Sequence, residues 1–137
     1  MLLKRILYSL KMSFNFKYPV VYLEIEDFNP VTGMLLGNFK TVPTLVMIQA
    51  NYCGACTRSK PEFQKLADKK PSFILATVQL DGEKESERKV ANILDKISSN
   101  LSSIPAYILF VKNQKIVYTG TGRTAEDLYK FVQKNVE

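Results

Sequence analysis

Apolar and polar positions divide the chain into short apolar runs and longer amphipathic stretches. Residues 44–50, 73–80 and 106–111 are near-continuous apolar runs of strand length. Such runs are typical of strands covered on both faces, as in a sheet flanked by helices. Residues 20–25 and 116–119 are rich in β-branched residues and predict two further strands. The pattern therefore indicates an α/β fold built on a central sheet.

Three amphipathic stretches predict helices between and after these strands. Residues 53–70 place Phe63, Leu66 and Ala67 on one face, with Lys and Arg outside it, and Pro61 inside this helix predicts a kink. Residues 83–100 predict a second helix, and Thr124 is a good N-cap for a third. With a short helix after the first strand, the order β, α, β, α, β, α, β, β, α predicts a mixed sheet with helices on both faces.

The first 19 residues differ from the remainder in charge. They hold four basic residues and no acid, and so carry +4 of the formal net charge of +6. Apolar residues at helical spacing within residues 1–12 predict a short amphipathic helix. We therefore divide the chain into a basic N-terminal arm or helix, 1–19, and a domain, 20–137. The arm is either a solvated or packed extension, or a membrane-surface or targeting segment; no nucleic-acid motif accompanies it.

Length and cysteine content restrict the function further. The chain has 137 residues, which suits one domain, with two cysteines and no histidine. One chain therefore cannot supply four Cys or His ligands to a structural zinc ion, although two chains could pool four cysteines. A Ser-His-Asp or Cys-His apparatus is excluded. We expect no metal and no cofactor, and no apolar run approaches a membrane span. Without a signal-peptide pattern, we expect an intracellular, cytoplasmic protein.

The two cysteines lie where a predicted buried strand gives way to a predicted helix, as Cys53-Gly54-Ala55-Cys56. Backbone N–H groups and the helix dipole at this position stabilise a thiolate, which is the species that attacks disulfides. We assign Cys53 as the nucleophile and Cys56, one turn further, as the cysteine that resolves a mixed disulfide. Gly54 and Ala55 are small and leave the first sulfur accessible. Two buried thiols, or half of a zinc site, remain alternatives.

Several motifs together resemble the thioredoxin and protein disulfide isomerase superfamily. Residues 44–66 are similar to its core, and Pro61 matches its kink proline. Ile104-Pro105 before an apolar strand resembles its cis-proline loop, and residues 112–117 resemble its closing hairpin. Residues 118–131 resemble the tail of a disulfide isomerase domain. The resemblance covers about residues 20–137 and implies a thioredoxin-like fold with an extra N-terminal arm or helix.

The resemblance also implies functional residues. The Ile104–Pro105 bond would be cis and face the cysteines, with an ordinary trans turn as the alternative. The Ile104 backbone would pair with an extended substrate strand. Tyr52, Gly54, Ala55, Ile104 and Pro105 are thus the candidate substrate-binding residues, and Pro61 gives structural support.

Three departures from the family affect the expected chemistry. Tyr52 replaces the usual tryptophan before the first cysteine. Met47 stands where thioredoxins carry a buried acid, and the position of its partner lysine, near Thr77, is uncharged. Deprotonation of Cys56 would then rely on water and be slower. The Gly54-Ala55 pair matches neither branch of the family, so the sequence does not predict the direction of the redox reaction.

These observations support three hypotheses. The first is a thiol–disulfide oxidoreductase whose partners are protein thiols and disulfides, with a reductase or oxidase to recycle it. The second is a non-enzymatic adaptor or structural component; the Lys, Asn and Ile usage suits a large DNA virus, in which it would serve the virion. The third is a binder of membrane surface or nucleic acid through residues 1–19.

Overall fold

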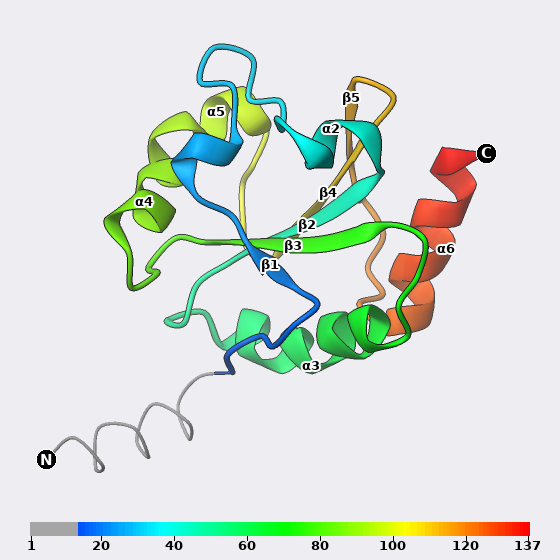
Figure 1. Ribbon diagram of the computed structural model, residues 1–137. Helices are drawn as coiled ribbons and strands as arrows, with labels where there is room; N and C mark the ends of the chain where they lie inside the picture. The colour runs from blue at the N-terminus through cyan, green and yellow to red at the C-terminus, as the bar shows by residue number, and fades with distance from the viewer. Residues whose placement is uncertain (1–13) are drawn as a thin grey trace, which may run out of the picture.

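The computed structural model describes residues 14–137, so the helix predicted for residues 1–12 lies outside the described residues. Its centre is a five-stranded sheet in the order β1-β3-β2-β4-β5 (Figure 1). The strands are β1 (Val21–Tyr22), β2 (Thr44–Gln49), β3 (Ile74–Gln79), β4 (Ala106–Val111) and β5 (Gln114–Val117). The three apolar runs of the sequence are therefore the three central strands, which confirms the prediction that both of their faces are covered.

The sheet is mixed, as predicted. Strands β1 and β2 run parallel to β3, whereas β4 is antiparallel to both β2 and β5. At the centre, Val46 of β2 pairs with Ala76 of β3 on one side and with Ile108 of β4 on the other. The parallel half of the sheet ends where β2 passes into the segment that holds the two cysteines.

Helices cover both faces of the sheet (Figure 1). One face packs against α3 (Gly54–Asp68) and α6 (Ala125–Val136), with Phe63, Leu66 and Leu128 in its core. The other face packs against the short elements, with Val90 and Ile97 in a second core. These elements are η1 (Ile25–Asp27), α2 (Asn38–Thr41), α4 (Glu85–Arg88), η2 (Lys89–Ile93) and α5 (Leu94–Ile97).

The helix predicted over residues 83–100 is wrong as a single element, because the chain forms α4, η2 and α5 in succession. The 3₁₀ segment has three residues per turn instead of 3.6. It therefore changes the direction in which the side chains of α5 point relative to those of α4. Val90 and Ile97 still reach the core, at 0% and 2% exposure. The helical spacing of apolar residues such as Val90 and Ile97 is thus compatible with their burial, but it does not predict the break.

Two predicted strands have different bounds in the structure. The strand predicted over residues 20–25 is limited to β1, because Glu24 and Asp27 form a capping box that begins η1. The strand predicted over 116–119 begins earlier, at Gln114, because Lys112 and Asn113 have positive φ and make a tight hairpin turn. Helix α6 begins as predicted, with the Thr124 side chain accepting a hydrogen bond from the Asp127 N–H over 3.1 Å.

Residues 14–20 lie against the helix that follows the cysteines. The ring of Phe16 is in the core, 5.5 Å from the ring of Phe63 between centroids. The Lys17 N–H donates a hydrogen bond of 2.8 Å to Gln64 Oε1 of α3. The C-terminal part of the segment that we assigned to the arm is thus packed on the domain. Within residues 14–137, no helix is long and apolar enough to cross a membrane.

Candidate functional site

The cysteine pair lies at the junction between β2 and α3. Cys53 is the N-cap residue of α3, and its Sγ accepts a hydrogen bond from the Cys56 N–H over 3.1 Å. Its carbonyl oxygen accepts from the Thr57 N–H over 3.1 Å, which begins the helical ladder. Cys53 is therefore positioned where unpaired N–H groups and the helix dipole favour a negative charge.

Cys53 and Cys56 form a disulfide, with their Cα atoms 5.2 Å apart. Cys53 is half-buried, whereas Cys56 is fully buried. An incoming thiolate can therefore reach Cys53 Sγ more readily than Cys56 Sγ. After reduction, the Cys56 sulfur would be within reach of Cys53 Sγ. The geometry rules out the alternative of two separate buried thiols. Among residues 14–137, no group of three or more His, Cys, Asp or Glu could hold a metal ion.

The loop before β4 lies beside this pair. The Ile104–Pro105 bond is cis, as the resemblance implied, and Pro105 is buried. The Ile104 carbonyl oxygen is 3.7 Å from Cys53 Sγ. A backbone acceptor next to the reactive sulfur provides a position at which an extended polypeptide can be held beside the disulfide.

The other predicted site residues directly flank Cys53 in the chain, apart from Pro61, which lies further along α3. Tyr52 is 74% exposed and directly precedes Cys53, so its ring is available to a partner. Gly54 is exposed and Ala55 half-buried, which leaves the approach to Cys53 Sγ without a large side chain. Pro61 lies inside α3, and the kink that we expect there stays a prediction.

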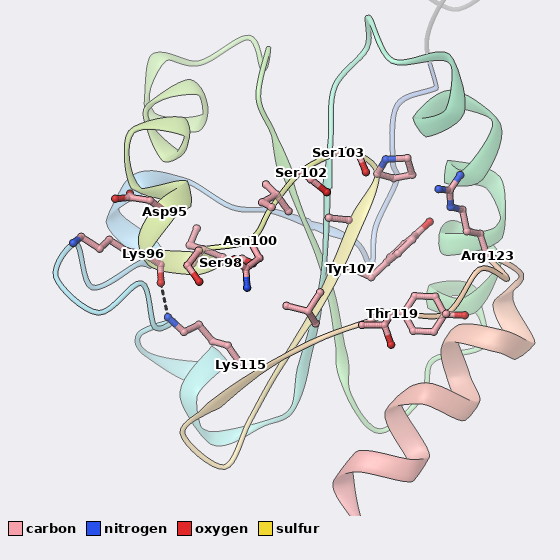
Figure 2. A pocket seen from close by; sticks show the side chains of 18 residues that line it. Asp95, Lys96, Ser98, Asn100, Ser102, Ser103, Tyr107, Lys115, Thr119 and Arg123 are labelled. Atoms are coloured by element: carbon pink, nitrogen blue, oxygen red, sulfur yellow. Dashed lines mark hydrogen bonds between the residues drawn. The ribbon is translucent and has the colours of Figure 1, made fainter.

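A groove of about 590 Å³ extends from Pro105 along β4 and β5 (Figure 2). Tyr107 and Arg123 lie together at one end, and Lys96 and Lys115 at the other. Between them the groove is lined mainly by hydroxyl and amide side chains of the loop that precedes β4, namely Ser98, Ser99, Asn100, Ser102 and Ser103. The groove is continuous with the cis-proline loop, because Ser103 and Pro105 line it.

Beneath the cysteines, Met47 is fully buried in β2, so no acid occupies this position. A polar group that sequence reasoning missed lies nearby. Lys60 of α3 is also fully buried, and its Nζ donates to Asn51 Oδ1 over 3.0 Å. The Asn51 N–H in turn contacts both carboxylate oxygens of Asp81 at 3.0 Å. The available signal was that Lys60 lies four residues after Cys56, on the same helix face.

Burial changes the acid–base properties of two groups near the site. It lowers the pKa of Lys60 from 10.5 to about 8, and the charge of Asp81 opposes this shift only in part. Burial also raises the pKa of Tyr107 to about 12. Tyr107 therefore stays neutral at physiological pH, whereas Lys60 titrates close to it.

Sequence comparison agrees with this geometry. The thioredoxin family model matches residues 38–134. The thioredoxin-like protein 453L of Invertebrate iridescent virus 6 is 32% identical over 130 residues, covering 85% of this chain and 94% of the viral protein. Protein disulfide-isomerase of Drosophila melanogaster is 30% identical over 119 residues, covering 81% of this chain. The chain spans 22% of the length of that isomerase.

Solved structures share the fold. Thioredoxin O2 from Arabidopsis thaliana in its oxidised state superposes with a TM-score of 0.59 at 19% identity, covering 86% of this chain and 95% of that one. The J-Trx1 fragment of ERdj5 gives a TM-score of 0.61 at 17% identity, covering 84% of this chain and 50% of the fragment. At these identities the likeness concerns the arrangement of the sheet and helices.

Proposed function

The chain belongs to the thioredoxin family, and on this premise we propose that it exchanges disulfides with protein substrates through Cys53 and Cys56. The family and the cysteine pair support a thiol–disulfide oxidoreductase in general. The observation that carries the proposal is the disulfide at the N-terminus of α3, with one sulfur accessible and the other buried.

The reaction consists of two exchanges. The Cys53 thiolate attacks one sulfur of a substrate disulfide, forms a mixed disulfide and releases the other substrate sulfur as a thiolate. The Cys56 thiolate then attacks Cys53 Sγ, which forms the intramolecular disulfide and releases the second substrate sulfur. Two electrons pass from the protein to the substrate. The reverse sequence oxidises a substrate dithiol, and the redox partner sets the direction.

Substrate positioning falls to the backbone beside the pair. The Ile104 carbonyl, 3.7 Å from Cys53 Sγ, can accept a hydrogen bond from an extended substrate segment. Such pairing is independent of side-chain identity, so it suits a range of unfolded or extended polypeptides. The adjoining groove offers hydroxyl and amide groups to the chain on one side of the target cysteine.

The proposal is tested by turbidity in an insulin-reduction assay with dithiothreitol as the electron source. We expect turnover with the wild type, none with Cys53→Ser, and a stable mixed disulfide with insulin in Cys56→Ser. Lys65→Met, at an exposed position of the same helix, serves as the matched control. Equal activity in the wild type and Cys53→Ser would refute the proposal.

One observation favours the second candidate, a non-enzymatic adaptor. Met47 occupies the place of the buried acid and is fully buried, so the usual proton acceptor is missing. An adaptor would hold its partner through contacts that do not involve sulfur. A partner that is retained by Cys53→Ser as well as by the wild type would support it, whereas capture that requires Cys53 supports the oxidoreductase.

A further inference from the structure

A lysine that faces the interior is unusual on the helix that carries the cysteines. The side chain of Lys60 is 0% exposed, as is that of Cys56, four residues earlier on α3. Residues four apart on a helix lie on one face, with Cβ atoms about 5–6 Å apart. Burying an ammonium group is costly unless it is paired or hydrogen-bonded. The effect of the Lys60 charge therefore depends on the groups that contact its ammonium group.

Both hydrogen-bond partners of Lys60 are neutral. Its Nζ donates to Asn51 Oδ1 over 3.0 Å and to the Phe14 carbonyl oxygen over 3.1 Å. Within the described residues, no salt bridge includes Lys60. Asp81 is close enough to raise the pKa of the amine, but its carboxylate oxygens accept from the Asn51 N–H and from Gln79.

Among residues 14–137, the other elements around this amine place no carboxylate in hydrogen-bond contact with it. Residues 14–16 carry no titratable side chain. Tyr22, whose hydroxyl accepts from the Phe16 N–H, is neutral with a raised pKa. The charged residues Glu83, Lys84 and Glu87 line the open groove outside Asn51 together with Asp81. In the disulfide state, the charge of Lys60 therefore has two neutral hydrogen-bond partners and the Coulombic influence of Asp81, and no carboxylate of the described residues forms an ion pair with it.

Reduction of the disulfide changes this balance. The Sγ–Sγ bond breaks as two electrons arrive from two glutathione molecules, which join to form glutathione disulfide. Of the two thiol protons that glutathione gives up, one stays on a cysteine and the other goes to solvent, so the reduced pair carries one thiolate. This anion forms within two helical turns of Lys60, because Cys53 and Cys56 precede it by seven and four residues at the start of α3. The ammonium group of Lys60 then favours the reduced state through Coulomb attraction.

We propose that the positive charge of Lys60 stabilises the thiolate of the reduced pair. The protein is therefore a weaker reductant than it would be without this charge. The inference rests on the proposed function. It also assigns a role to the departure from the family at Met47. Where a buried acid would disfavour the thiolate, this chain has an apolar residue and places a cation on the neighbouring helix instead.

The test is a redox titration of the wild type and Lys60→Met against glutathione buffers. Near pH 7 we expect the equilibrium of the variant to shift about tenfold toward the disulfide, a potential lower by ~30 mV. The difference should shrink by about pH 10, because the wild-type amine is then neutral. Lys65→Met, which removes an exposed charge from the same helix, should match the wild type at both pH values.

A merely structural role for Lys60 predicts a different result. Its loss would then leave the potential unchanged, or shift it equally near pH 7 and pH 10, and either result would overturn the inference. Lys60→Gln removes the charge and keeps a polar end, so it replaces Lys60→Met if the latter does not fold. If the wild type itself does not cycle between dithiol and disulfide, the proposed function fails; if it cycles and both variants match it, only the role of Lys60 fails.

Discussion

The backbone N–H of Cys56 donates a hydrogen bond to Sγ of Cys53 over 3.1 Å. This contact joins the two cysteines independently of their disulfide and directs a helix N-terminal donor at the accessible sulfur. After reduction, the same donor is available to a thiolate on Cys53, where it acts in addition to the helix dipole. The relationship between these two residues thus supports the assignment of the first cysteine as the nucleophile.

From this contact we expect the Cys53 thiol to have a pKa below the ordinary value of about 8.5. The absorbance of the reduced protein near 240 nm, followed against pH, should show one thiolate that forms below that pH. Cys53→Ser should remove this low transition, and Cys56→Ser should retain it. If the low transition survived in Cys53→Ser, the thiolate would belong to another residue, and the assignment of Cys53 as the nucleophile would be wrong.

The core beneath the site should be sensitive to loss of Phe63. Its ring is fully buried on α3, with centroids 5.5 Å from Phe16 and 6.0 Å from Tyr107. We expect Phe63→Ala to lower the free energy of unfolding by about 3–5 kcal/mol, because the substitution removes buried apolar surface and also leaves a cavity. Urea denaturation measures this. Phe63→Leu should cost less, and equal losses in both variants would contradict the cavity argument.

Two glycines with positive φ provide a matched test of a close approach between backbones. Gly33 has φ +72°, and a Cβ there would lie 2.5 Å from the carbonyl of Lys96, whereas Gly37, at φ +64°, has open space. We expect Gly37→Ala to cost about 1–3 kcal/mol from backbone strain alone. Gly33→Ala should cost at least about 1 kcal/mol more, because it also collides with the segment that follows η2. Thermal or urea unfolding of both variants would show equal losses if that approach were absent.

The buried amine should make stability depend on pH. In the folded oxidised protein the pKa of Lys60 is about 8, below its ordinary value of 10.5. Between these values the unfolded chain binds more protons, so the free energy of unfolding rises with pH across this window. We expect oxidised Lys60→Met to exceed the wild type in stability below about pH 8, by on the order of 2 kcal/mol, and to lose this advantage by about pH 10.5. A pH-independent difference in urea midpoints would contradict this assignment.

The central sheet could be predicted from the sequence because three of its strands are covered on both faces and are therefore apolar throughout. The junction of β2 and α3 could be predicted for the same reason, since only two residues separate Cys53 from the end of the apolar run. The break at η2 could not, because hydrophobic spacing in residues 83–100 is compatible with one helix. In the structure only α4, the first of the three pieces, packs closely against β3 and η1.

The burial of Lys60 was also beyond the sequence. A lysine is ordinarily assigned to the solvent face of a helix, and the spacing of four residues from Cys56 is too weak a local signal to reverse that assignment. What buries this side chain is the Phe14 carbonyl, 46 residues earlier, together with Asn51 in the preceding loop. Contacts between distant segments thus determine the one part of the site that differs most from its sequence-based description.

The most direct test of the account is the redox state of Cys53 and Cys56 in the native protein across glutathione buffers of increasing oxidised fraction. Alkylation with a mass tag followed by mass spectrometry counts the thiols at each ratio. We expect one two-electron transition between a fully reduced pair and an intramolecular disulfide, fully reversible without denaturant. Two thiols that stay reduced at every ratio, or a disulfide that opens only in denaturant, would contradict the account.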